Sequence, residues 1–365
     1  MQISPQLRMD IEKVVVITIF YMIISLFMAF NNNVMIASEF SLGFSGEVTP
    51  EFNLYVHVLI GLLAGMIGGS LFVFVNARLF RKKSFRFGLV STLITYTSVF
   101  ILITAFVSVF AADDLNYFDP GAIIQEIWSS ITAPMALVNF LFWGFISLCT
   151  LFMLQVNDKF GPGILRKFLL GKYTQPTQEE RVFMFLDMKS STSIAENMSP
   201  NLYFRLLRDC FSDVAQPVIM HEGEIYQYVG DEIVVSWESE KGFRNGNCLK
   251  CFHALQRKIE KRKDYYLNKY GVLPVFKAGL HYGTVTAGEI GDIKKDIVYS
   301  GDVLNTTARI QNLCNQYQAD LLASEEALSQ IQWEDLGFST TSLGSISLRG
   351  RKQEVLLSSV SNFGN

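Results

Sequence analysis

Four long apolar stretches in the first 156 residues constrain the fold of this chain more than any other feature. Each is long enough to cross a bilayer, which takes about 20 residues of helix. Because backbone groups in lipid must be hydrogen-bonded internally, the sequence predicts four transmembrane helices. We place them near Val14–Phe30, Tyr55–Val75, Phe87–Ala111 and Pro134–Val156. A signal peptide is the alternative for the first stretch, but no small-residue cleavage site follows it.

The charges of the connecting loops predict how these helices are oriented. The connector between the second and third stretches is basic, and further basic residues follow the fourth, whereas residues 31–55 and 112–133 contain no Lys or Arg. Positive residues concentrate on the cytoplasmic side of a membrane. We therefore expect a multi-pass protein of a plasma or inner membrane, with both termini in the cytoplasm.

Gly61, Gly65 and Gly69 recur every fourth residue in the second stretch and so share one helix face. Small residues at this spacing let two helices approach closely. We expect this face to pack within a single four-helix bundle, and a contact between two copies of the chain is the alternative. We interpret His57, near the outer end of the same stretch, as a polar group at the membrane interface rather than as a haem ligand.

The composition changes near residue 159, and the net charge of −3 hides this change because most of the charge lies in the second part. No uniformly basic surface is indicated, so nucleic acid is not an expected partner. Five scattered cysteines suggest no disulfide framework and fit a reducing compartment. We divide the chain into a four-span membrane domain (1–158), a linker (159–180) and a soluble domain (181–362).

Strand-like and helix-like segments alternate in the soluble domain. Bulky runs bounded by turn residues predict strands at Val182–Leu186, Glu224–Tyr228, Glu232–Trp237, Phe276–Tyr282 and Leu321–Ala323, with two more around Arg349–Arg351. Helical spacing of apolar residues predicts helices at Leu202–Met220, Cys248–Tyr266 and Thr306–Cys314. The order β-α-β-β-α-β predicts an α+β fold, a ferredoxin-like antiparallel sheet covered by helices.

Two aspartates and a separate amide–guanidinium pair carry the strongest chemical signal. Asp187 and Asp231 each follow a strand-like run. Such carboxylates suit Mg²⁺, which binds few of them and leaves room for phosphate oxygens. Asn305 and Arg309 share one helix face, and a guanidinium there can stabilise charge that develops on a phosphate. The small residues after Asp187, which are Ser190, Ser191 and Thr192, begin a predicted helix whose backbone N–H groups favour an anion.

These motifs resemble the catalytic domain of class III nucleotide cyclases, which includes adenylyl and guanylyl cyclases. The resemblance covers residues 181–360 and rests on five segments in order, which are 185–192, 230–234, 279–283, 288–291 and 301–309. It implies a reaction in which ATP is converted to 3′,5′-cyclic AMP and pyrophosphate. The chain would then be a membrane-anchored adenylyl cyclase, whose spans are candidates for receiving an unidentified stimulus.

The resemblance also implies roles for individual residues. Asp187, Asp231 and the carbonyl group of Met188 would bind two Mg²⁺ or Mn²⁺ ions per site. Asn305 would orient the ribose, and Arg309 would stabilise the pentavalent phosphorus. Arg351 stands where the family has a lysine that contacts the terminal phosphates. The family builds its sites at a dimer interface, and because one chain carries one copy of each motif, a homodimer is expected.

Two positions depart from the family pattern for selecting the base. Gln227 stands where adenylyl cyclases often carry Lys and guanylyl cyclases carry Glu, and Val298 stands where adenylyl cyclases often carry Asp or Thr. A Gln amide can hydrogen-bond either purine, whereas Val298 can bond neither. We expect ATP to be preferred over GTP. The alternatives are a guanylyl or dual-specificity cyclase and a sensor that binds nucleotide without turnover.

Overall fold

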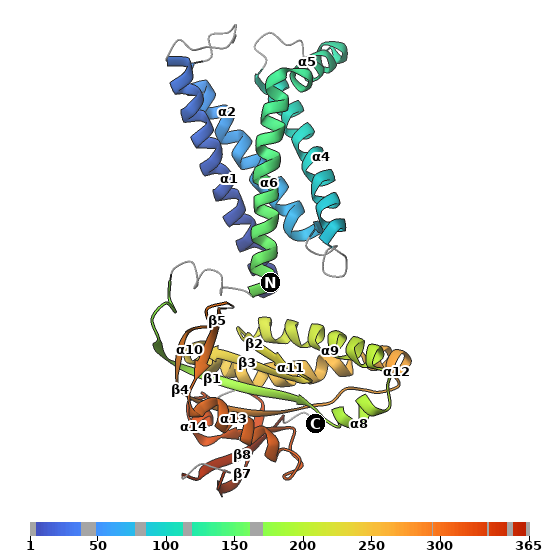
Figure 1. Ribbon diagram of the computed structural model, residues 1–365, viewed down its shortest axis with the longest axis vertical. Coiled ribbons are helices and arrows are strands. Elements are labelled where there is room, and N and C mark those ends of the chain that lie inside the picture. The colour runs from blue at the N-terminus through green and yellow to red at the C-terminus, as the bar shows by residue number, and fades with distance from the viewer. Residues whose placement is uncertain are drawn as a thin grey trace. The chain divides into compact units, whose positions relative to one another are not determined.

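The computed structural model describes residues 5–37, 49–76, 85–111, 119–160, 171–293, 295–333, 336–348 and 353–362. The chain divides into two compact units, Met1–Lys159 and Phe160–Asn365. The described residues of the first unit are almost all helical, and the second unit combines helices with a β-sheet (Figure 1). The predicted fold class, four apolar helices followed by an α+β domain, is confirmed.

The first unit contains α1 (Pro5–Ala37), α2 (Pro50–Leu63), α4 (Phe85–Ala111), α5 (Pro120–Thr132), α6 (Pro134–Phe160) and the π-helical turns η1 (Ala64–Gly68) and η2 (Leu71–Asn76), which follow α2. Within the described ranges, four helical segments are long and apolar enough to cross a membrane: Leu7–Val34, Pro50–Val75, Arg86–Phe110 and Pro134–Asn157. They overlap the four predicted stretches. The sequence did not predict α5, a short amphipathic helix that begins after Asp119, whose carboxylate accepts a hydrogen bond from the backbone N–H of Gly121 at 2.9 Å.

The glycine face of α2 and η1 packs against α1 of the same unit. A Cβ atom added at Gly65 would lie 2.5 Å from the Cα atom of Thr18, and one at Gly61 would lie 3.0 Å from the Cα atom of Met22. Any larger residue would therefore push the two helices apart. Packing within one bundle, which the glycine spacing predicts, is confirmed for this face.

The second unit is built on one eight-stranded sheet in the order β2-β3-β1-β4-β6-β8-β7, with β5 paired to β4. Its strands are β1 (Thr177–Met188), β2 (Glu224–Val229), β3 (Glu232–Glu238), β4 (Phe276–Ile290), β5 (Asp296–Ser300), β6 (Leu321–Ser324), β7 (Phe338–Ile346) and β8 (Val355–Asn362). Only β4 and β6 pair in parallel; the other described strand pairs are antiparallel.

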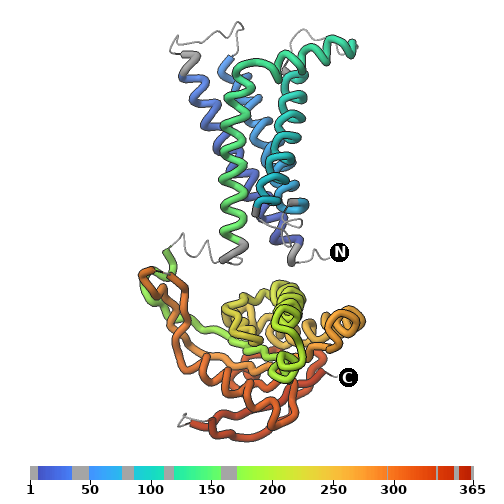
Figure 2. The backbone as a smooth tube through the Cα atoms, turned by 45° about the vertical axis from the view of Figure 1, so that its right-hand side comes forward, coloured from blue at the N-terminus to red at the C-terminus, as the bar shows by residue number. Residues whose placement is uncertain are grey.

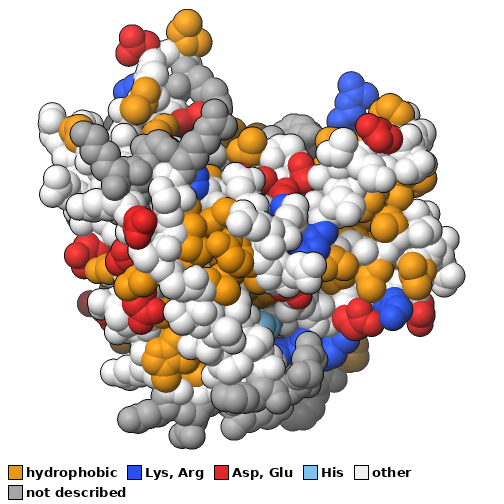
Figure 3. All heavy atoms as spheres, turned by 90° about the horizontal axis from the view of Figure 1, so that it is seen from below, with side chains coloured by type: hydrophobic (Ala, Val, Ile, Leu, Met, Phe, Trp, Pro, Cys, Tyr) orange, Lys and Arg blue, Asp and Glu red, His pale blue; other side chains and the backbone are white. Residues whose placement is uncertain are grey.

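The helices of the second unit are α8 (Ser191–Glu196), α9 (Pro200–Met220), α10 (Ser239–Phe243), α11 (Asn247–Glu260), α12 (Lys263–Tyr270), α13 (Asp302–Leu313) and α14 (Glu325–Leu328), with a 3-10 turn η3 (Arg244–Gly246). Figure 2 shows the sheet of this unit curving beneath its own helices α9 and α11. Acidic and basic side chains are interspersed over the face that Figure 3 shows, with apolar side chains exposed between them.

Strand β1 lies at the centre of the sheet and is buried on both faces. Val182, Met184 and Leu186 contribute to the core beneath α9 and α11, whereas Phe183 and Phe185 pack on the opposite face. Alternate residues of a strand point to opposite faces, so this bulky run fills both cores at once. The position at the end of β1 is therefore rigidly held.

The predicted helix Cys248–Tyr266 is wrong as one element, because the structure divides it into α11 and α12. Arg262, between them, has φ −107° and ψ 16°, outside the helical region. Its guanidinium donates to both carboxylate oxygens of Asp213 on α9 at 2.6 Å and lies over the ring of Tyr265. This contact with another helix ends α11, and a local sequence pattern does not reveal it.

Candidate active site

Asp187 and Asp231 meet at one end of the sheet. Asp187 is the penultimate residue of β1, and Asp231 lies in the tight turn between β2 and β3. Gly230 gives this turn its left-handed backbone, with φ 64°. Because β1 pairs with β3 in antiparallel register through Leu186 and Ile233, the two carboxyl groups come close enough to interact directly.

The electrostatics of this corner favour a cation. Burial raises the pKa of Asp187, and the neighbouring Asp231 carboxylate raises it further, against the opposing effect of Lys277. Burial also raises the pKa of Glu232 to about 7, with further contributions from the charges of Asp187 and Asp231. The Oδ2 atom of Asp231 is buried and lacks a hydrogen-bond partner within the described part of the chain. A divalent cation would neutralise this excess of negative charge.

The donor set fits a hard cation shared with a substrate. No cluster of three or more His, Cys, Asp or Glu side chains able to hold a metal is found among the described residues. A pair of aspartates alone leaves coordination positions for water and phosphate oxygens, the arrangement common for Mg²⁺. The residues present therefore fit an ion that is completed by a phosphorylated ligand.

Two side chains that the sequence did not single out hold Asp187 in place. The Nζ atom of Lys277 lies 3.1 Å from Oδ2 of Asp187, and the amide of Gln311 donates to the same oxygen at 3.0 Å. Lys277 is directly opposite Asp187 in the β1–β4 register, and its side chain is only 8% exposed. The sequence signal for this contact is a lysine within the apolar run at the start of β4. Its pairing with Asp187 depends on the register between β4 and β1.

Asn305 and Arg309 lie on the side of α13 that points away from Asp187. Thr307 and Gln311 are buried against β4, where a Cβ atom on Gly279 would lie only 2.4 Å from the backbone nitrogen of Gln311. With about 100° of rotation per residue, Arg309 is on nearly the opposite face from Gln311. The Nη1 atom of Arg309 is buried and has no hydrogen-bond partner among the residues described. Within one chain, the two aspartates therefore lie together, but Asn305 and Arg309 do not point toward them.

The remaining predicted site residues are distributed as follows. Ser190 adopts the left-handed conformation, with φ 55°, immediately before α8, which starts at Ser191 and includes Thr192. Met188 ends β1 and is buried. Arg351 lies outside the described residues.

Gln227 and Val298 lie on neighbouring parts of the second unit. Gln227 is exposed on β2 beside a bulge, and Val298 is half-buried on β5, opposite Gly288. The preceding and following residues, Tyr226 and Tyr299, join the two strands, because their ring centroids are 5.0 Å apart and the Tyr226 hydroxyl accepts a hydrogen bond from the Tyr299 N–H.

Residues 173–358, slightly more than half of the chain, match the adenylate and guanylate cyclase catalytic domain. The chain therefore belongs to this family, as the motif resemblance predicts. The match contains both aspartates, Lys277 and the whole of α13.

Three known proteins illustrate the similarity. Adenylate cyclase 2 of Rhizobium meliloti (strain 1021) is 34% identical over 210 residues, which cover 58% of this chain and 58% of that protein. The adenylate cyclase of Anabaena cylindrica is 30% identical over 156 residues, or 40% of this chain and 30% of that protein. The structure of a bacterial light-regulated adenylyl cyclase superposes with a TM-score of 0.52 at 18% identity, covering 63% of this chain and 65% of that one. The match thus spans well under two thirds of the length of the curated relatives, and the structural likeness is one of fold.

Proposed function

We propose that the protein is a membrane-bound adenylyl cyclase that converts ATP to 3′,5′-cyclic AMP and pyrophosphate at the interface of a homodimer. The observation that carries the proposal is the contact between the half-buried Asp187 and Asp231 in a cyclase-family sheet, where the buried Oδ2 atom of Asp231 has no hydrogen-bond partner among the described residues. The names of the Rhizobium and Anabaena relatives, both adenylate cyclases, support ATP as the substrate.

Asp187, Asp231 and the Met188 carbonyl would hold two divalent cations, Mg²⁺ or Mn²⁺. Such ions, when bound, activate an attacking oxygen and neutralise a leaving group. The chain itself supplies the rigid frame: Lys277 and Gln311 hold Oδ2 of Asp187, and the central strand fixes the backbone. The carboxyl groups of Asp187 and Asp231 lie near Glu232, and their negative charges contribute to its raised pKa. This concentration of negative charge supports the assignment of a cation site.

Most of the groups that position ATP would come from the second subunit. Asn305 would orient the ribose, so that its 3′-oxygen faces the α-phosphorus. Arg309 would bind the α-phosphate with its unpaired guanidinium nitrogen. Arg351 would contact the other phosphates from the second subunit, whereas the Ser190–Thr192 segment, which follows Asp187 in the chain, would contact them from the metal-binding subunit. Nucleophile and target share one molecule, so holding them in a reactive geometry is the main catalytic contribution of these residues.

Base selection and membrane orientation complete the proposal. Gln227, exposed on β2, would hydrogen-bond the adenine, while Val298 would contribute only apolar contact. The basic loop between the second and third spans supports an orientation in which both termini and the catalytic domain are cytoplasmic.

The test is nucleotide turnover by the full chain, purified in detergent, with ATP and GTP and with each metal. We expect cyclic AMP as the main product and a smaller GTP activity. Asp231→Asn should lower turnover by about 100-fold or more, whereas Asp264→Asn, an exposed acid on α12, should leave it unchanged. Absence of any cyclic nucleotide would refute catalysis, and equal turnover of both nucleotides would refute the preference for ATP.

A further inference from the structure

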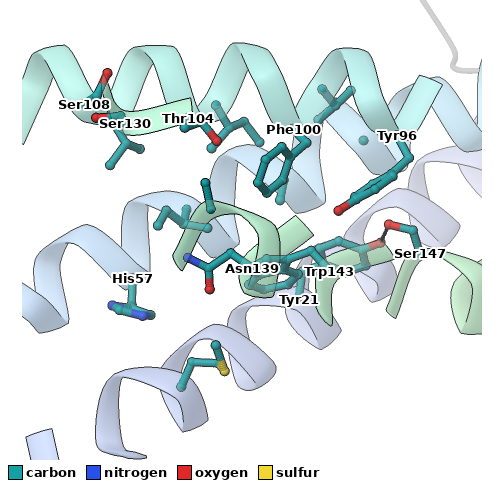
Figure 4. Close-up of a pocket in the computed structure, with 18 of the residues that line it drawn as sticks. Tyr21, His57, Tyr96, Phe100, Thr104, Ser108, Ser130, Asn139, Trp143 and Ser147 are labelled. Atoms are coloured by element: carbon teal, nitrogen blue, oxygen red, sulfur yellow. Dashed lines mark hydrogen bonds between the residues drawn. The ribbon is translucent and has the colours of Figure 1, made fainter. Parts of the chain in front are cut away.

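A partly open cavity of about 330 Å³ lies in the first unit and is lined by residues of α1, α2, α4, α6 and the end of α5 (Figure 4). It reaches the end of the bundle at which α2 and α6 begin, and its lining there includes His57, Thr104, Ser130 and Asn139. Apolar and aromatic side chains form most of the wall. The described residues that line the cavity include no Asp, Glu, Lys or Arg, so it is suited to an uncharged occupant.

A few polar groups in the wall are available to a ligand. Figure 4 shows the Asn139 side chain extending from α6 into the space between α2 and α4. Neither its amide nor the Thr104 hydroxyl forms a hydrogen bond with the rest of the described chain. By contrast, the Tyr21 hydroxyl contacts Ser147 at 3.1 Å, and His57 Nδ1 contacts the Asn53 carbonyl at 2.9 Å. An unpaired amide in apolar surroundings is costly, which favours a bound partner.

The shape of the wall also points to a ligand. Tyr96, Phe100 and Trp143 present aromatic rings, which pack well against another flat ring. The π-helical turn η1 also lines the cavity, with Ala64 and Gly68, and π-turns inside helices are frequent at functional sites. A Cβ atom at Gly68 would meet only Val99, at 4.0 Å, so this glycine leaves open space, unlike the glycines packed on α1.

We propose that this cavity binds a small uncharged ring compound that carries a carbonyl or hydroxyl group. The amide of Asn139 and the hydroxyl of Thr104 hydrogen-bond the polar group, and the aromatic wall stacks on the ring. The volume is at the lower end of the range for ligand pockets, which limits the occupant to one or two rings. A quinone from the membrane and a water-soluble aromatic carbonyl compound share this chemistry. The inference concerns binding alone and does not depend on the proposed catalysis.

The test uses the full chain in detergent micelles, with ubiquinone-1 and 7-methoxycoumarin as the two probes. Because Trp143 lines the cavity, a bound probe should quench its fluorescence saturably, and Trp143→Phe should remove the saturable part. Asn139→Leu and Thr104→Val should each weaken binding roughly fivefold, the effect of one lost hydrogen bond. Thr97→Val, a matched change on α4 outside the cavity, should bind like the wild type.

Gly68→Leu should abolish saturable binding by filling the cavity, with circular dichroism and gel filtration used to check the fold of every variant. Saturation by ubiquinone-1 alone assigns the site to a membrane quinone, and saturation by 7-methoxycoumarin alone assigns it to a water-soluble compound. Saturation by either probe or by both, with binding weakened about fivefold in the Asn139 and Thr104 variants, supports the proposal. If quenching by both probes rises linearly, or if those two variants bind like the wild type, the proposal is overturned.

Discussion

At the scale of residues, the candidate metal site depends on the contacts that hold the carboxyl group of Asp187. Oδ2 accepts contacts from Lys277 at 3.1 Å and Gln311 at 3.0 Å. These two contacts restrict the rotation of the carboxyl group, which also lies close enough to Asp231 to interact with it. Groups that orient a metal ligand without touching the metal contribute strongly to affinity.

Replacing Gln311 by Leu should therefore weaken divalent-metal binding by about tenfold. The reason is that Asp187 would lose one of the two contacts that hold it. The measurement is a titration with Mn²⁺, followed by electron paramagnetic resonance of the free ion. Gln256→Leu is the matched control, because Gln256 donates to the exposed Asp320 instead. Equal affinities for the two variants would contradict the role of Gln311.

A second residue-scale prediction concerns the contact between α9 and α12. Lys269 and the hydroxyls of Tyr265 and Tyr270 donate to Asp209 and, against the opposing effect of burial, lower the pKa of Asp209 to about 2, from an ordinary value of 3.8. Between these pH values the unfolded chain binds more protons than the folded one. The stabilisation is therefore present above about pH 4 and is lost as the pH falls toward 2.

We expect the free energy of unfolding of the wild type to fall more steeply between pH 5 and pH 2.5 than that of Asp209→Asn. Urea unfolding of the full chain measures both free energies, followed by tryptophan fluorescence, to which the buried Trp237 contributes. Asp264→Asn, an exposed acid on α12, should keep the wild-type slope. Parallel curves for the wild type and Asp209→Asn would show that the Asp209 contacts do not stabilise the fold.

At the scale of elements, the close approach of α13 to β4 determines the position of the helix that carries Asn305 and Arg309. Gly279 permits this approach, since a Cβ atom there would lie 2.4 Å from the Gln311 nitrogen and 2.7 Å from the Thr307 carbonyl oxygen. Both are backbone atoms, which cannot rotate away as a side chain can. The spacing of strand and helix is therefore set by this one glycine.

Gly279→Ala should lower the free energy of unfolding by about 1–3 kcal/mol, the usual cost of forcing extra atoms into a packed core. It should also weaken metal binding, because Gln311 moves with α13. Gly288→Ala on the same strand is the control, since its Cβ atom would meet only Pro176 at 3.5 Å, an ordinary contact. Urea unfolding and the Mn²⁺ titration distinguish the two variants. Equal stability would mean that α13 adjusts at little cost.

Elements with a strong local pattern could be predicted, and those defined by distant contacts could not. The strand β1, the helix α9 and the turn that contains Asp231 can each be recognised from their local sequence. β1 has a bulky run, α9 has an apolar face, and the turn contains Gly230. The short strand β5 has an apolar run of only three residues, 297–299, and it pairs with the far end of β4 because β4 extends to Ile290. The end of α11 depends on Arg262 reaching Asp213, and the role of Lys277 depends on strand register.

For the whole molecule, the direction of the Asn305–Arg309 face is the main argument for a dimer. Gln311 contacts Asp187 from the other side of the same helix, so one chain cannot present both faces of α13 to its own aspartates. The unpaired Nη1 atom of Arg309 then needs an anion supplied at another surface. A two-fold symmetric pair of chains satisfies both requirements, with two equivalent sites.

This arrangement predicts complementation between inactive variants. Asp231→Asn removes the metal side of a site and Arg309→Ala removes the opposite side, so each alone should lack activity. When both are co-expressed in equal amounts, half of the dimers are mixed and each has one intact site, so about a quarter of the wild-type turnover should return. Asp187→Asn with Asp231→Asn is the control, because both changes affect the same side and no site is restored. If the first mixture stays as inactive as its parents while the chains still associate, the two halves of the site are not shared between subunits.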